Sequence, residues 1–100
     1  MALLDKVKGA MRIAVNAYDT ELTALINAAL ADLRVSAGIA DNVATASTND
    51  PLVIQATITY CRAHFGSPAD YDRLKASYDE QKAQMQYATG YGIEEVGVNG

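Results

Sequence analysis

Cysteine, histidine and tryptophan are almost absent from this sequence. Cys61 is its single cysteine and His64 its single histidine, and it contains no tryptophan. One cysteine cannot form an internal disulfide, so the chain suits a reducing compartment. Cys61 and His64 share a helix face, but a metal site needs further ligands, and the sequence supplies none nearby. We therefore predict no metal ion and no cofactor.

The sequence also lacks the motifs of an enzyme. No acid orients Cys61 and His64 into a catalytic pair, no oxyanion motif accompanies them, and no glycine-rich phosphate loop occurs. The expected roles are a buried packing cysteine and a partly buried structural histidine. We predict that the protein is not an enzyme and has no catalytic residues.

Long apolar runs and basic clusters are missing too. No segment reaches membrane-spanning length and none resembles a secretion signal, which predicts a soluble protein without a membrane partner. The net charge is -4, with both signs interspersed, whereas nucleic-acid binding needs a basic face. One small basic group, Lys6, Lys8 and Arg12, is either a minor nucleic-acid-binding patch or, as we favour, the solvated face of a helix.

What the sequence does contain is an apolar helix with both ends encoded, between Asp50 and Pro68. Asp50 can cap this helix, Pro51 suits its first position, and Gly66 can adopt the left-handed conformation that ends it. A helix this apolar is surrounded by other elements or by other copies of itself. We expect its apolar surface to exceed what three short neighbours can cover. That surface comprises Leu52, Val53, Ile54, Ala56, Thr57, Ile58, Tyr60, Cys61 and Phe65. Gln55, Thr59 and Arg62 are expected to face water, and His64 either joins them or is partly buried.

Two helices are predicted before this central one. The first spans residues 3 to about 14, because apolar residues recur there at helical spacing. The second has Asp19 as its N-cap and ends at Gly38, with Ile39 packing back over its last turn. A polar loop, residues 40–49, follows, and it is either a surface excursion or a contact with a neighbouring subunit.

A further helix is predicted after the central one, which makes the fold class all-α, a small bundle of about four helices. Ser67 can cap this last helix, with Pro68 at its first position and Asp70 as the capping-box acid, and it runs to about Thr89. Helical spacing predicts an apolar stripe, formed by Tyr71, Leu74, Tyr78 and Met85. It also predicts one ion pair, between Lys75 and Asp79.

The end of the chain differs in character, since residues 90–100 hold four of the seven glycines. Such a segment does not hold a helix, so we predict a helical domain, residues 1–90, and a flexible C-terminal tail, residues 91–100. A free solvated end is one interpretation of the tail. Because it keeps apolar and aromatic side chains, we also hypothesise that it binds a partner, through Tyr91, Ile93, Val96 and Val98.

Several stretches, in order along the chain, resemble one protein family. The strongest likeness lies in Asp50-Pro51-Leu52-Val53-Ile54-Gln55-Ala56 and in Tyr60-Cys61-Arg62-Ala63-His64-Phe65-Gly66. Further likeness lies in Tyr18-Asp19-Thr20-Glu21-Leu22, Leu25-Ile26-Asn27-Ala28-Ala29, Asp32-Leu33, Gly38-Ile39, Arg73-Leu74 and Ser77-Tyr78-Asp79. Over roughly residues 4 to 89 the chain resembles the phage head–tail connector proteins. These small helical adaptors, also called DNA-packaging proteins, bind below the portal.

The resemblance implies a four-helix subunit that assembles with itself into a ring, roughly twelvefold, around the DNA channel. Its partners would be the portal protein and a downstream tail or stopper protein, in the virion at the head–tail interface, after a stage in the host cytoplasm. DNA would pass through without specific binding, which the acidic net charge allows. The alternative is a small helical regulator or toxin–antitoxin-type protein that dimerises through the central helix.

Overall fold

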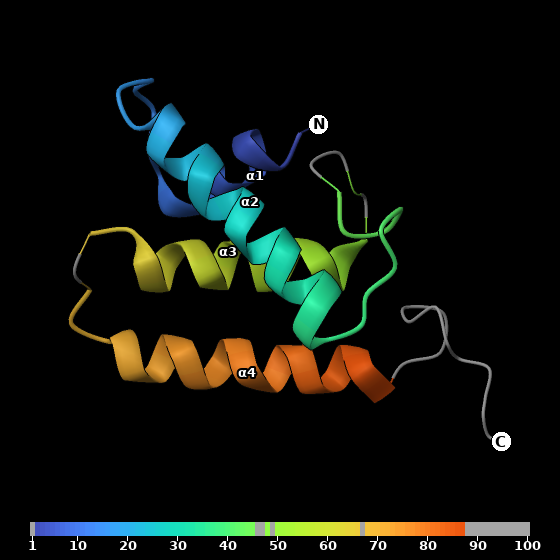
Figure 1. Cartoon of the computed structure of the whole chain (residues 1–100). Helices are drawn as coiled ribbons and strands as arrows, with labels where there is room; N and C mark the ends of the chain where they lie inside the picture. The colour runs from blue at the N-terminus through green and yellow to red at the C-terminus, as the bar shows by residue number, and fades with distance from the viewer. Residues whose placement is uncertain (1, 46–47, 49, 67, 88–100) are drawn as a thin grey trace, which may run out of the picture.

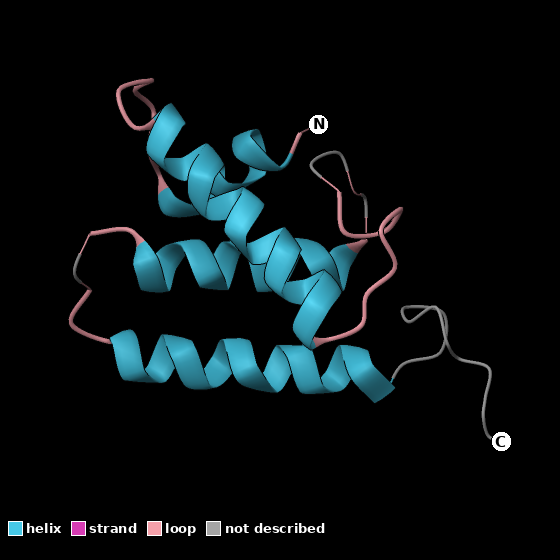
Figure 2. Cartoon of the chain, viewed as in Figure 1, coloured by secondary structure: helices cyan, strands magenta, loops and turns pink. Residues whose placement is uncertain are grey.

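The computed structural model describes residues 2–45, 48, 50–66 and 68–87 and contains four α-helices. No strand occurs in these described ranges (Figure 2). The predicted all-α bundle is therefore confirmed, while the predicted tail lies outside the described residues. The helices are α1 (Leu3–Met11), α2 (Asp19–Ser36), α3 (Pro51–His64) and α4 (Tyr71–Tyr87).

Helix α3 is the centre of the bundle, because it contacts each of the other three helices. Figure 1 shows α4 running alongside α3 and α2 crossing α3 obliquely. Every helix contributes side chains to one apolar core. Among its largest fully buried members are Leu3, Val7, Leu22, Leu33, Val53, Cys61 and Met85.

The ends of α3 agree with the sequence prediction. The Asp50 carboxylate accepts hydrogen bonds from the backbone N–H groups of Leu52 (2.9 Å) and Val53 (3.2 Å), which caps the helix. Gly66 has a φ of +71°, the left-handed conformation expected of it. Two predicted exposures are wrong. Leu52 is 37% exposed, and Thr59 is buried, because its hydroxyl donates to the Gln55 carbonyl oxygen at 3.0 Å and needs no water.

Helices α1, α2 and α4 cover most, but not all, of the apolar surface of α3. Val53, Ala56 and Cys61 are fully buried and Ile58 is 7% exposed under α1, α2 and α4. Leu52 is the one large apolar side chain of α3 that is exposed within the described ranges. The expected excess of apolar surface is thus limited to Leu52 and to the partly exposed Ile54, Tyr60 and Phe65.

Helix α1 ends at Met11, earlier than the predicted residue 14. Arg12 adopts a left-handed conformation with a φ of 59°, and the N–H of Ile13 bonds the Lys8 carbonyl oxygen at 2.9 Å. Together with the Arg12 N–H bond to the Gly9 carbonyl oxygen, this forms the turn that glycine usually provides. An arginine in that position gives no sequence signal, whereas Gly9, a weak helix former, remains inside the helix.

Helix α2 starts and stops close to the predicted residues. Asp19 is its first helical residue instead of its N-cap, and its carboxylate pairs with the Lys8 ammonium at 2.7 Å. At the other end, Gly38 has a φ of +72° and Ile39, 2% exposed, donates its N–H to the Leu33 carbonyl oxygen at 3.1 Å. The predicted return of Ile39 over the last turn is confirmed.

Helix α4 begins at Tyr71, so Pro68 is not at its first position as predicted. The Leu74 N–H bonds the Asp70 carbonyl oxygen at 3.0 Å, which places Asp70 at the N-cap position. Ser67, the predicted cap, and Thr89, the predicted end, lie outside the described residues. The Lys75–Asp79 pair is confirmed at 2.9 Å.

Helices α2 and α4 are joined by a polar cluster around Asp32. Its carboxylate accepts hydrogen bonds from Tyr78 Oη (2.6 Å), Lys82 Nζ (3.0 Å) and Ser36 Oγ (2.7 Å). Burial on its own raises the pKa of Asp32, but these three donors outweigh it and lower the pKa below 3.8. The cluster therefore holds a charged carboxylate between two helices that are far apart in sequence.

The described part of the loop that follows α2 is anchored inward. Ala44 is fully buried, and its carbonyl oxygen accepts a hydrogen bond from Arg34 at 2.8 Å. Thr48 is 6% exposed, and its carbonyl oxygen accepts a bond from Lys6 Nζ at 3.3 Å. These contacts do not fit a plain surface excursion. Contact of this loop with a neighbouring subunit stays a prediction.

Candidate functional site

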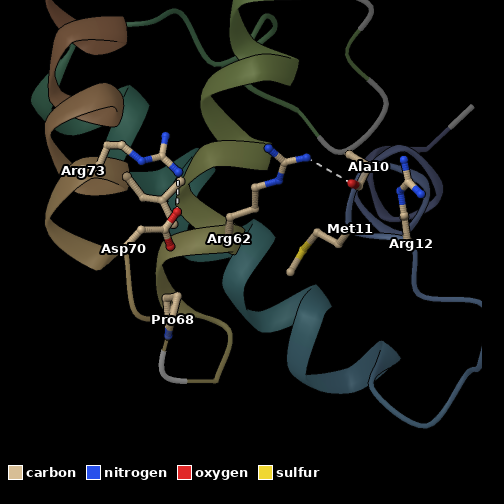
Figure 3. A pocket seen from close by; sticks show the side chains of 8 residues that line it. Ala10, Met11, Arg12, Arg62, Pro68, Asp70 and Arg73 are labelled. Carbon is tan, nitrogen blue, oxygen red and sulfur yellow. Dashed lines mark hydrogen bonds and ion pairs between the residues drawn. The ribbon is translucent and has the colours of Figure 1, made fainter.

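An open groove of about 400 Å³ lies where α1 ends, α3 ends and α4 begins. Three arginines line it, one from each region: Arg12 after α1, Arg62 from α3 and Arg73 from α4. Apolar side chains and one acid, Asp70, complete the lining (Figure 3). We call this the arginine groove.

Two of the three arginines are held by contacts within the subunit. Arg62 donates to the Ala10 carbonyl oxygen at 3.0 Å, which satisfies a carbonyl in the last turn of α1. Arg73 pairs with the Asp70 carboxylate one turn before it. Figure 3 shows Arg62 between the Asp70–Arg73 pair and Ala10. Both guanidinium groups are thus positioned at the groove by the fold.

Arg12 differs from the other two arginines. Its side chain is exposed and makes no hydrogen bond or ion pair within the described ranges, and its backbone is left-handed. A left-handed arginine costs roughly 1–2 kcal/mol relative to the usual backbone. Three positive charges against one negative charge make the groove basic, although the whole chain carries -4. Guanidinium groups in such numbers can bind a carboxylate or a phosphate through paired hydrogen bonds.

The basic group predicted from sequence, Lys6, Lys8 and Arg12, is not a shared solvated face. Lys6 bonds the Thr48 carbonyl oxygen, and the Lys8 side chain, only 13% exposed, reaches Asn16 and Asp19. Arg12 instead joins Arg62 and Arg73, 50 and 61 residues further along the chain. No local pattern could have indicated this grouping, because it depends on how α1 packs against α3 and α4.

Cys61 and His64 have different environments. Cys61 is fully buried, and burial raises the pKa of its thiol to about 12, so the thiol stays protonated at neutral pH. His64 is exposed, which agrees with the water-facing alternative and not with partial burial, and its ring lies against Tyr60 (4.3 Å between centroids) and Tyr71 (5.8 Å). Within the described ranges, no three or more His, Cys, Asp or Glu residues form a group that could hold a metal ion.

The partner-binding residues predicted in the tail cannot be placed relative to this groove. Tyr91, Ile93, Val96 and Val98 all lie outside the described residues, so their role stays a prediction. Within the helices that are described, none is long and apolar enough to cross a membrane.

Comparison with known proteins gives one match. No curated protein and no solved structure matches the chain significantly. A family model described as "Phage connector protein" matches residues 3–92, a range that includes all four helices. The family is structural, and its members connect the head and the tail of a phage. The chain therefore belongs to the phage connector protein family and has the structural role of a phage connector.

Proposed function

We propose that the protein is an adaptor subunit that assembles into a ring below the portal, around the channel through which DNA passes. The observation that carries this proposal is the family match over residues 3–92, which includes every helix of the bundle. Its partners are further copies of itself, the portal protein and a downstream tail or stopper protein. It acts at the head–tail interface of the virion and is present in the host cytoplasm before assembly.

The proposed role is mechanical and not enzymatic. The family is structural, and the protonated, buried Cys61 is unsuited to nucleophilic chemistry. The net charge of -4 disfavours tight binding of DNA, so DNA can move through the ring.

The chain divides, in this proposal, into a helical connector domain, residues 1–90, and a tail, residues 91–100. The tail binds a neighbouring subunit or the portal through its apolar side chains, which are Tyr91, Ile93, Val96 and Val98.

A dimeric regulator is the less favoured function. Dimerisation through the central helix needs an extended exposed apolar face on α3, and α1, α2 and α4 cover most of that helix. Leu52 is its one exposed large apolar side chain among the described residues.

Attachment to capsids tests the proposal. Full-length protein is mixed with portal-bearing capsids that lack the connector, and the bound fraction is measured by co-sedimentation. We expect binding to these capsids and none to capsids without a portal. Deletion of residues 91–100 should weaken attachment while circular dichroism stays that of a helical bundle. A full-length protein that never attaches would contradict the proposed function, and a deletion that attaches as tightly would remove the role of the tail.

A further inference from the structure

We propose that the arginine groove binds the tail of a second copy, through the segment Ile93-Glu94-Glu95-Val96. This inference rests on the proposed function, because a ring places a second copy next to the first. It assigns a receiver to the tail and a partner to three arginines that the bundle itself leaves with spare donors.

Charge complementarity is the first reason. Arg62 donates one hydrogen bond to the Ala10 carbonyl oxygen, and a guanidinium group has five N–H donors, so further donors remain. The Arg12 side chain has no hydrogen-bond or ion-pair partner within the described ranges, and Asp70 balances only one of the three positive charges. The tail carries two adjacent carboxylates, Glu94 and Glu95. Paired hydrogen bonds between guanidinium and carboxylate are among the strongest that side chains form.

The mixed lining of the groove is the second reason. Besides its charges, the groove is lined by Met11, Pro68 and Leu74, which offer apolar surface. An extended peptide alternates its side chains between two faces. In Ile93-Glu94-Glu95-Val96, either face therefore presents one carboxylate and one apolar side chain. That composition matches a groove that is both basic and apolar.

The reach of the chain identifies the receiver as a second copy. The groove lies at the N-terminal end of α4, and the tail leaves from its C-terminal end. From Tyr87 back to Arg73, which lines the groove, α4 spans roughly 21 Å, and seven residues from Tyr87 to Glu94 reach at most about 25 Å when fully extended. A subunit could bind its own tail only with the connecting segment almost fully extended. Binding to the next subunit has no such constraint and gives a head-to-tail contact, the kind that closes rings.

A labelled peptide of residues 88–100 tests the groove directly. Its binding to the full-length protein is followed by fluorescence anisotropy at low salt. Arg12→Glu removes no side-chain hydrogen bond or ion pair within the described ranges and reverses one charge of the groove, so we expect about tenfold weaker binding. Lys75→Glu, an equal change of charge on α4 outside the groove, is the matched control and should leave binding unchanged. A peptide of the same composition in scrambled order should not bind.

A charge-swap mixture tests whether the contact joins two copies. One protein carries Glu94→Arg and Glu95→Arg, and the other carries Arg12→Glu and Arg73→Glu. Each alone should lose association measured by sedimentation, and their mixture should recover it, because each tail then meets a groove of opposite charge. Circular dichroism verifies that both proteins remain folded. Failure of the mixture to recover association, with peptide binding intact, would mean that a subunit binds its own tail.

The outcomes separate this inference from the proposed function. Equal peptide binding by wild type and Arg12→Glu, or by the scrambled peptide, overturns the inference. Attachment to capsids under those same conditions would leave the proposed function standing. Specific peptide binding without any attachment to capsids would support the inference about the groove and contradict the proposed adaptor function.

Discussion

Removal of the Tyr78 hydroxyl tests the contact that joins α2 to α4. Tyr78 is 5% exposed and donates to the Asp32 carboxylate at 2.6 Å, and burial together with this bond raises its pKa. Tyr78→Phe keeps the ring, which packs edge-on against Tyr60 (5.3 Å between centroids), and removes only the donor. Asp32 retains Lys82 and Ser36, so the variant should fold.

The expected loss follows from the charge of the acceptor. Hydrogen bonds to charged groups contribute about 1.5–3 kcal/mol, and the Asp32 side chain is 30% exposed, which favours the lower end. We expect Tyr78→Phe to lower the free energy of unfolding by about 1.5 kcal/mol. For a domain of this size, such a loss lowers Tm by roughly 6–12 °C.

The same variant has a defined pH dependence. The pKa of Asp32 is lower in the folded protein than its ordinary value of 3.8, so its stabilisation is present above that pH and is lost as the pH falls through the lowered value. Tyr78→Phe removes one cause of the lowered pKa. The stability difference between wild type and variant should therefore be full at pH 7 and should shrink below pH 3.8.

Urea unfolding followed by circular dichroism at pH 7 and at pH 3 measures both effects. Tyr71→Phe is the matched control, because the Tyr71 hydroxyl makes no hydrogen bond within the described ranges and its loss should change stability by less than about 0.5 kcal/mol. If Tyr78→Phe behaves like Tyr71→Phe at neutral pH, the cluster around Asp32 contributes nothing and this reasoning is wrong.

Three other substitutions have expected results. Cys61→Ala should lower the free energy of unfolding by about 1 kcal/mol or somewhat more, while assembly stays intact. The native thiol should resist a thiol reagent until the protein unfolds. Loss of function at an unchanged Tm would refute the packing role. Asp50→Ala should cost about 1 kcal/mol in urea unfolding, since two N–H groups lose their acceptor, and an unchanged midpoint would argue against the cap. Arg12→Gly should raise stability by about 0.5 kcal/mol, because relief of the left-handed backbone exceeds the entropy gained by the unfolded chain; a lower Tm would contradict this.

Features encoded by neighbouring residues were predictable from the sequence. Asp50 and Pro51 mark the start of α3, Gly38 and Ile39 mark the end of α2, and each signal lies within a few residues of the structure it determines. The Lys75–Asp79 pair likewise follows from spacing alone.

Features that depend on packing were not predictable. The spacing of apolar residues predicts that α1 reaches residue 14. The helix ends earlier because Arg12 is left-handed, and the sequence gives no sign of that conformation. Thr59 is buried although it is polar, because its hydroxyl donates to the Gln55 carbonyl oxygen, and a hydropathy pattern does not indicate such a bond. The Asp32–Tyr78 bond joins residues 46 apart in sequence.

The arginine groove was missed for the same reason. Arg12, Arg62 and Arg73 belong to three separate segments, and only the packing of α1, α3 and α4 brings them together. In the sequence, Arg12 groups with Lys6 and Lys8, because those residues are its neighbours along the chain.

The mass of the assembled protein tests the central claim most directly. Analytical ultracentrifugation over a range of concentrations, alone and with the portal protein of the same phage, measures that mass, and negative-stain electron microscopy shows its shape. We predict closed rings of many copies, at high concentration or once the portal is present. A strict monomer at every concentration, with the portal as well as without it, would contradict the account.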